Sequence, residues 1–134
     1  MPIELTWMLP DKILLARWYG MVRAEDASIF LEELSLILDE APRLLHIVLE
    51  ASELIDVTMD AVYLYLGSNI NFHPRRGRIA AVGGGYRVEI VADVINRISQ
   101  YDLIRLFRTR EEAQDFLLSH DTPPPVRPGV LPPI

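Results

Sequence analysis

The chain opens with two short runs of apolar residues, at positions 3–9 and 13–19, which Pro10-Asp11-Lys12 separates. Proline and aspartate favour turns, so this pattern predicts a β-hairpin. Apolar residues then recur at helical spacing over residues 25–41, and Pro42 ends that predicted helix.

A continuous aliphatic run at residues 44–49 is typical of a central strand that is covered on both faces. The polar residues 50–53 predict a loop after this strand. A second, strongly apolar helix follows Thr58 and extends to about Asn71. A short buried strand is predicted at 79–82.

The last third of the chain continues the alternation of helix and strand. Apolar spacing over residues 88–98 predicts a third helix, and residues 103–107 predict the last strand. The fourth helix begins after Thr109, which with Glu112 fits a capping box. The order ββαβαβαβα predicts an α/β fold with a mostly parallel sheet, an N-terminal hairpin and four helices.

Composition narrows the class of protein. The 134 residues carry a net charge of −6, which argues against nucleic-acid binding because phosphate binding needs concentrated positive charge. Residues 1–60 hold a net −8 and residues 61–134 a net +2, which indicates either solvated faces or complementary self-association. With no cysteine and no apolar run near the ~20 residues that span a bilayer, we expect a cytoplasmic protein without a membrane span.

The end of the chain differs from the rest. Residues 1–120 form the predicted domain, and residues 121–134 hold six of the ten prolines. Such a segment favours polyproline II conformation. It is either a frayed tail or a strap over a neighbouring chain, for which Val130, Leu131 and Ile134 would be the anchors.

The start of the second helix is a candidate modification site. Thr58 fits a helix-capping residue, which satisfies free N–H groups. It also fits a phosphoacceptor, since a phosphate there would meet the positive end of the helix, with Asp56 and Asp60 keeping the unmodified site acidic.

The same helix is apolar nearly all round. Met59, Tyr63, Tyr65 and Leu66 are candidates for a partner or dimer surface, since one sheet cannot cover every side of such a helix. Ordinary burial is the alternative.

Two segments are candidates for anion binding. The first is the turn at Gly84 and Gly85, which allows an anion to approach the backbone amides closely and which Arg87 follows. The second is a predicted basic loop at 75–78, which contains Arg75 and Arg76. Each segment also fits an ordinary turn or a solvated loop. Neither nucleotide-binding glycine motif is present.

Catalytic and metal sites have little support. The histidines fall on different predicted elements, and His46, inside a buried strand, fits a hydrogen-bonded core residue. No serine has the context of a hydrolase nucleophile. We predict no catalytic residue, no metal and no cofactor, and therefore a protein that is not an enzyme.

The element order, the run at 46–50, the helix opening at 55–58 and the closing segment 103–117 resemble the STAS and SpoIIAA-like superfamily. The closing segment is similar to that superfamily's F-x-T/S-x-E-E-A pattern. In anti-sigma-factor antagonists of the superfamily, an Asp-Ser-Ser-Gly motif precedes the second helix and its second serine is phosphorylated. Thr58 stands at that serine's position, whereas the first serine and the glycine are replaced by Val57 and Met59.

Two functions follow from this resemblance. The first is a non-enzymatic protein-interaction or regulatory module, anti-sigma-factor-antagonist-like, that binds a protein partner or itself as a homodimer. The second rests on the similarity of the fold to CRAL-TRIO lipid-binding domains. It is a protein that binds a small apolar molecule or lipid between the second helix, the third helix and the sheet.

Overall fold

The computed structural model describes residues 2–126 of the chain, and within that range five strands form one sheet. The strands are β1 (Ile3–Leu9), β2 (Ile13–Val22), β3 (Leu45–Val57), β4 (Arg76–Val82) and β5 (Ile104–Phe107). The helices are α1 (Ala24–Glu40), α2 (Met59–Leu66), α3 (Gly85–Ser99) and α4 (Arg110–Ser119), with a 3-10 helix η1 (Asn69–Phe72). This is the predicted α/β order, with the short η1 added.

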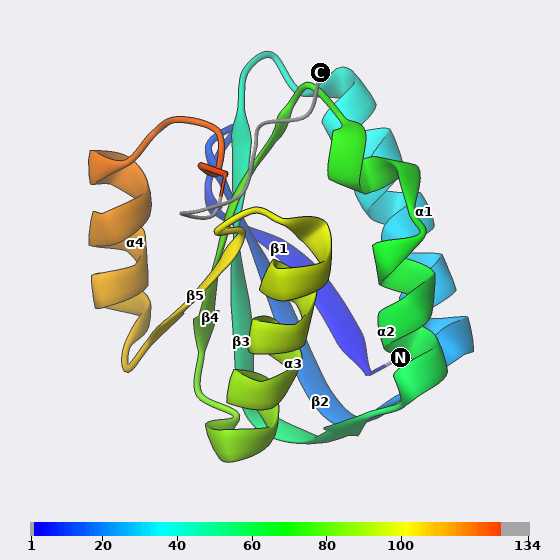
Figure 1. The fold of residues 1–134 in the computed structure, drawn as a ribbon. Helices are drawn as coiled ribbons and strands as arrows, with labels where there is room; N and C mark the ends of the chain where they lie inside the picture. The colour runs from blue at the N-terminus through cyan, green and yellow to red at the C-terminus, as the bar shows by residue number, and fades with distance from the viewer. Residues whose placement is uncertain (1, 127–134) are drawn as a thin grey trace.

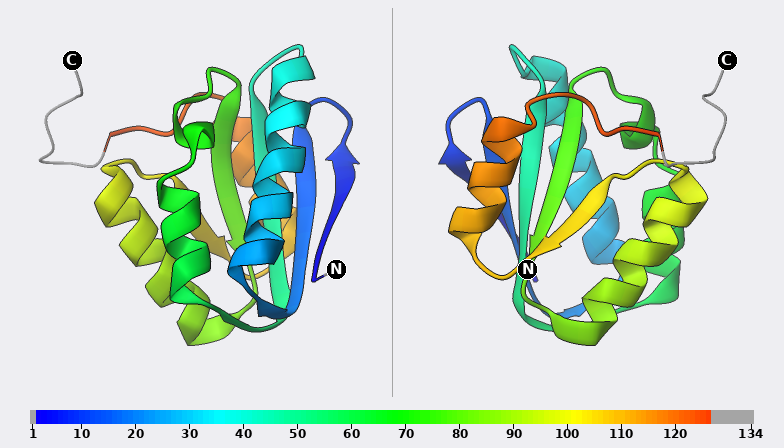
Figure 2. Two further views of the ribbon diagram at one scale, coloured as in Figure 1. Left: turned by 90° about the vertical axis from the view of Figure 1, so that its right-hand side faces the viewer. Right: turned by 60° about the vertical axis from the view of Figure 1, so that its left-hand side comes forward.

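The sheet is a simple progression of strands in chain order, β1-β2-β3-β4-β5. β1 and β2 are antiparallel and form the predicted hairpin, while β2 to β5 pair in parallel. The helices that connect the parallel strands cover the sheet unequally. α1, α2 and α3 lie on one face and α4 lies alone on the other (Figures 1 and 2).

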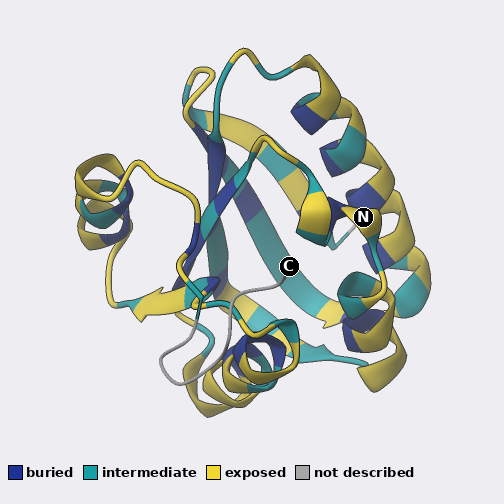
Figure 3. Cartoon of the chain, turned by 45° about the horizontal axis from the view of Figure 1, so that its top comes forward, coloured by how far each residue is buried: buried dark blue, intermediate teal, exposed yellow. Residues whose placement is uncertain are grey.

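Each face of the sheet has its own core. Leu14, Leu45 and Ile47 pack under α1 to α3, whereas their neighbours Ile13 and Val48 pack under α4. This alternation follows from the two-residue period of a strand. The helices turn their buried sides inward and their exposed sides to solvent (Figure 3).

The strand β3 is longer than the predicted one. The polar residues 50–53 do not form a loop but continue the strand to Val57, which pairs with Val22 at the end of β2. The parallel ladder continues because Ala51 is fully buried there, while the exposed Glu53 pairs with Arg17 of β2 at 2.8 Å. The polar residues 50–53 therefore lie within a long strand and do not mark the end of β3.

The second predicted helix is divided in two. α2 ends at Leu66, where the N–H of Gly67 donates to the carbonyl of Tyr63. The side-chain amide of Asn71 then donates to the carbonyls of Tyr65, Leu66 and Ser68, at 2.9, 3.4 and 3.2 Å. These bonds satisfy the free carbonyls of the helix end and fold residues 69–72 back as η1.

An irregularity at the start of β4 decides which way its first side chain faces. Leu45 pairs with Arg76, but two residues later Ile47 pairs with Ile79, so β4 carries one extra residue. A bulge of this kind changes the face to which side chains point. Arg76 therefore lies on the same side of the sheet as Ile79, under the helices, although regular alternation would place the two on opposite sides.

The ring of His46 holds this bulge. The backbone N–H of Arg78, which lies in the irregular segment, donates to His46 Nδ1 at 2.9 Å. Gly77 packs so closely on the ring and on the carbonyl of Leu45 that a side chain there would collide with both. Since Nδ1 accepts, Nε2 carries the proton and donates to Asp121 at 2.8 Å. The prediction that His46 is a hydrogen-bonded core residue is confirmed.

The segment after α4 runs along its own chain as far as it is described. Asp121 pairs with Arg43 as well as with His46, and the N–H of Asp102 donates to the carbonyl of Pro125 at 2.8 Å. The domain boundary at 120 stays a prediction. The proposed anchors of a strap, Val130, Leu131 and Ile134, lie outside the described residues.

Burial of His46 leads to a testable dependence of stability on pH. Burial lowers the pKa of His46 below its ordinary 6.5, more than the Asp121 carboxylate raises it. The unfolded chain then binds a proton that the folded chain does not, so stability is complete above about pH 6.5 and falls as the pH falls below it. One proton allows a slope of at most about 1.4 kcal/mol per pH unit.

The measurement is urea unfolding of wild type and of His46→Gln between pH 7.5 and 5.5. Glutamine retains a donor and an acceptor but does not titrate. We expect the wild type to lose stability more steeply than the variant as the pH falls. Equal slopes for the two proteins would contradict a neutral, buried His46.

Candidate functional site

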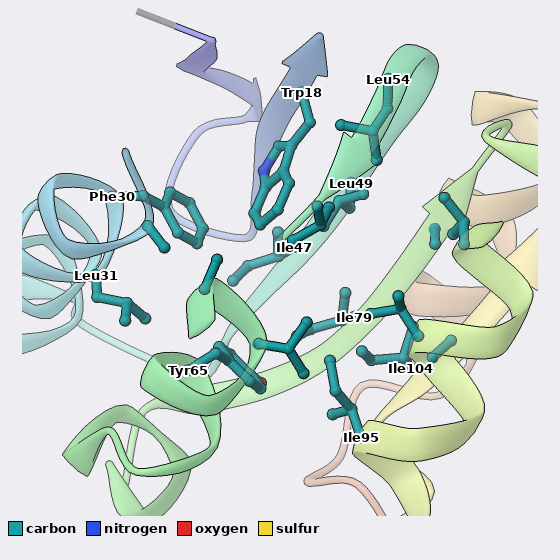
Figure 4. Close-up of a pocket in the computed structure, with 18 of the residues that line it drawn as sticks. Trp18, Phe30, Leu31, Ile47, Leu49, Leu54, Tyr65, Ile79, Ile95 and Ile104 are labelled. Carbon is teal, nitrogen blue, oxygen red and sulfur yellow. The ribbon is translucent and has the colours of Figure 1, made fainter. Parts of the chain in front are cut away.

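An apolar cavity lies between the sheet and the three helices on its more covered face. Its volume is about 100 Å³, and it is lined by residues of β2, β3, β4, β5, α1, α2 and α3. Figure 4 shows Trp18 of β2, Phe30 of α1, Tyr65 of α2 and Ile95 of α3 around this space. The cavity lies where the apolar-ligand hypothesis places it, with α1 as an additional wall.

Small side chains on the helices leave this space open. Ala27 of α1, Ala61 of α2 and Ala92 of α3 all line the cavity and are almost fully buried. On the sheet side, the Trp18 ring stands edge-on to Phe30 with ring centroids 5.5 Å apart. Interiors are normally packed without voids much larger than a water molecule, so an apolar space of this size is a binding-site candidate.

Four polar atoms of the cavity wall are buried without a hydrogen-bond partner in the described chain. They are Trp18 Nε1, Tyr65 Oη, and Nε and Nη1 of Arg76. All four are donor groups, and a buried donor that is left unpaired costs about 1–3 kcal/mol. The surface of the cavity is therefore almost wholly apolar, and unpaired donors are buried within the residues that form its wall.

The Arg76 end of the cavity is electrostatically unusual. Burial lowers the pKa of the Arg76 guanidinium, and the nearby Tyr65 and Tyr101 hydroxyls act in the opposite direction. Burial raises the pKa of Tyr65 to about 12, so its hydroxyl stays protonated at neutral pH. The guanidinium lies 5.6 Å from the centroid of the Tyr101 ring, and residues 2–126 offer it no carboxylate.

The opposite end of the cavity has a paired charge. Asp56, near the end of β3, forms an ion pair with Arg87 in the first turn of α3, and both residues line the cavity. Gly84, which precedes α3, and Gly85, its first residue, have positive φ values that suit glycine. The predicted anion-binding group Arg87 thus lies beside Asp56, which was predicted to support Thr58.

The two predicted anion-binding segments do not form one site. Arg75 and Arg76 precede β4 or begin it, whereas Gly84 and Gly85 follow its other end. A seven-residue strand separates its ends by roughly 20 Å. The placement of Arg76 in an exposed basic loop is wrong, because Arg76 belongs to β4 and is half-buried, while Arg75 is exposed.

The predicted surface of α2 is divided between the inside and the outside of the molecule. Met59 and Tyr63 are 53% and 62% exposed. Tyr65 and Leu66 are half-buried and pack against the core, and the Tyr65 hydroxyl is sealed. The prediction of a contact surface that includes Tyr65 is therefore corrected: Tyr65 is a wall of the cavity.

Thr58 is the residue before α2, as predicted, but its Oγ1 makes no capping hydrogen bond. That oxygen is buried and unpartnered within the described residues. Asp60 accepts a hydrogen bond from the Ala61 N–H at 3.0 Å, and Asp56 accepts one from the Val57 N–H at 2.9 Å. The role of Thr58 as a phosphoacceptor stays a prediction.

Over residues 2–126, no three histidine or acidic side chains cluster in a way that could hold a metal ion. In the same range, no helix has the length and apolar character needed to cross a membrane.

Sequence reasoning missed the donors of the cavity. Trp18 reads as an ordinary strand residue, and Arg76 is one of three arginines in a short polar stretch. The signal that separates Arg76 from its neighbours is the extra residue of the bulge. In the sequence, a lone glycine within a strand pattern, here Gly77, indicates such a bulge.

The comparisons with known proteins support the fold. No protein-family model matches the chain, and no curated protein matches it. Among solved structures, it is similar to an uncharacterised protein of the DUF3478 family with a SpoIIAA-like fold from Shewanella loihica PV-4. That match has a TM-score of 0.64 and 20% identity, over 86% of this chain and 91% of the other.

It is also similar to the anti-sigma factor antagonist SpoIIAA in its unphosphorylated form, with a TM-score of 0.64 and 16% identity over 87% of this chain and 97% of the other. The phosphorylated form of the Bacillus cell fate determinant SpoIIAA matches with a TM-score of 0.59 and 15% identity, over 86% and 98% of the two chains. At these identities the similarity concerns the fold. The chain is a domain with the SpoIIAA-like, STAS-like fold.

Proposed function

We propose that this protein is a non-enzymatic binding protein that takes up a small apolar or amphipathic molecule in the cavity between the sheet and α1, α2 and α3. The observation that carries the proposal is an apolar space of about 100 Å³ whose wall holds unpaired buried donors. An apolar cavity of comparable size, created by mutation in another protein, binds benzene.

The apolar wall supplies the driving force. Each CH₂ group that leaves water for an apolar site contributes about 0.8 kcal/mol, so a molecule with six to eight such carbons would gain roughly 5–6 kcal/mol before the cost of immobilisation. A cytoplasmic location, expected from the sequence, belongs to the same proposal.

Filling the cavity should abolish binding. Ala92 points into it from α3, and Ala92→Leu would occupy part of the space. We expect at least a tenfold loss of affinity for 1-octanol. The readout is the fluorescence of Trp18 in a Trp7→Phe background, which leaves Trp18 as the sole tryptophan.

The matched control is Glu89→Leu, which adds an apolar side chain at an exposed position of the same helix. It should bind 1-octanol as the parent protein does. Absence of any 1-octanol binding by the parent, or equal binding by Ala92→Leu, would contradict the proposed function.

A second candidate function is protein interaction through the exposed side of α2, with a second copy of this chain as the occupant. Met59, Tyr63 and Leu64 of α2 are 53%, 62% and 40% exposed, and Met59 and Tyr63 lie one turn apart on the same face of the helix. The opposite net charges of residues 1–60 and 61–134 support self-association. Regulation by phosphorylation of Thr58 belongs to this candidate, since SpoIIAA has been solved in phosphorylated and unphosphorylated forms.

A charge on this face should disrupt the dimer. We expect Tyr63→Glu to shift the protein to monomer in sedimentation velocity, because a carboxylate would have to lose water in the interface. Leu118→Glu, at an exposed position of α4 on the other side of the sheet, is the control and should leave the mass unchanged. A wild type that is monomeric at 100-fold different loading concentrations would exclude this candidate.

A further inference from the structure

The Arg76 end of the cavity holds a cation that has no counter-charge in the described chain. Its Nε and Nη1 atoms are sealed from solvent and unpaired, and its electrostatic partners in the described chain are the hydroxyls of Tyr65 and Tyr101. A guanidinium does not lose its proton inside proteins, so burial cannot remove this charge. The unliganded protein therefore has an unneutralised cation in the wall of an apolar space.

We propose that the molecule bound in the cavity is an organic monocarboxylic acid, whose apolar body fills the space under the helices and whose carboxylate pairs with Arg76. This inference rests on the proposed function, since it assigns the chemical class of the ligand of the same cavity. It adds the charge, the polar group and the orientation of the ligand.

The donors match a carboxylate in type. Arg76 offers a permanently charged guanidinium from the cavity wall, and a hydrogen bond from a charged donor to a carboxylate is stronger than one between neutral groups. The Tyr65 hydroxyl, close enough to interact electrostatically with Arg76, supplies a further donor. Its pKa of about 12 keeps the proton that it donates.

The balance of charge selects a monoanion. One guanidinium is neutralised by one carboxylate, whereas a phosphate monoester would bring close to two negative charges into the same apolar surroundings. The other arginine of the cavity wall, Arg87, is already paired with Asp56. A neutral alcohol would satisfy one donor and leave the buried charge unpaired.

The position of Arg76 depends on the bulge, and this is a second observation in favour of a ligand. A regular β4 would turn Arg76 to the other face of the sheet. The extra residue at Gly77 turns it inward, and the backbone N–H of the next residue, Arg78, donates to the His46 ring. The fold thus places a half-buried charge at the edge of an apolar core by a specific backbone arrangement. Such an arrangement, unfavourable for packing alone, is characteristic of a functional position.

Removal of the charge should have opposite effects on stability and on binding. Arg76→Met retains the length of the side chain and removes the unpaired cation, so the unliganded protein should melt at the same or a higher temperature. The affinity for octanoate should fall at least tenfold, while the affinity for 1-octanol stays within threefold. A substitution that merely damaged the fold would lower the melting temperature and both affinities together.

The experiment titrates hexanoate, octanoate and decanoate, and the matching alcohols, into the full chain at pH 7.5 with Trp18 fluorescence in the Trp7→Phe background. Arg76→Met and Tyr65→Phe are the test variants. Arg75→Met is the matched control, because Arg75 is the adjacent arginine and is exposed. In the parent protein, at least one acid should bind at least tenfold more tightly than its alcohol.

Each outcome decides between the two proposals. Tighter binding of acids that disappears in Arg76→Met and persists in Arg75→Met supports the carboxylate assignment. Equal binding of acids and alcohols, or acid binding that survives Arg76→Met, overturns the assignment and leaves the proposed function intact. No binding of any acid or alcohol overturns both.

Discussion

One hydrogen bond sets the character of the candidate site: the backbone N–H of Arg78 donates to the Nδ1 of the buried His46. It satisfies the amide that the extra residue of β4 leaves unpaired in the ladder, and the absence of a side chain at Gly77 gives the ring its place. Without this bulge, Arg76 would face the α4 side of the sheet. The inner face would then lack its unpaired cation and retain only the paired charges of Asp56 and Arg87.

The cavity and its buried charge have opposite energetic consequences. Apolar walls of α1, α2, α3 and the sheet favour an apolar occupant, while unpaired donors of Arg76, Tyr65 and Trp18 disfavour an empty site. The two features together describe a space that is more stable when filled by a molecule with an apolar body and an acceptor group. A local loss of folding stability of this kind is typical of functional sites.

Periodicity of apolar residues was sufficient to predict the hairpin, the parallel sheet and the four helices, because these depend on burial that repeats every two or 3.6 residues. It could not predict that β3 continues through residues 50–53, where pairing with β2 outweighs polar composition. For the site, the pattern located the apolar space beside α2 but placed Tyr65 and Arg76 on the surface. Periodicity does not show that either side chain points inward. Tyr65 lies on the single buried side of α2, and a one-residue bulge turns Arg76 inward.

His46 also joins parts of the molecule that are distant in sequence. Its ring accepts a hydrogen bond from the backbone of β4 on one side and donates one to Asp121, beyond α4, on the other. Asp121 in turn pairs with Arg43 after α1. The layer formed by α4 and the layer formed by the other helices are thus connected through one imidazole. A contact that displaced Asp121 from this ring would change the hydrogen bonding of β4, the strand that carries Arg76. The segment after α4 is therefore connected, through two hydrogen bonds, to the cavity on the other face of the sheet.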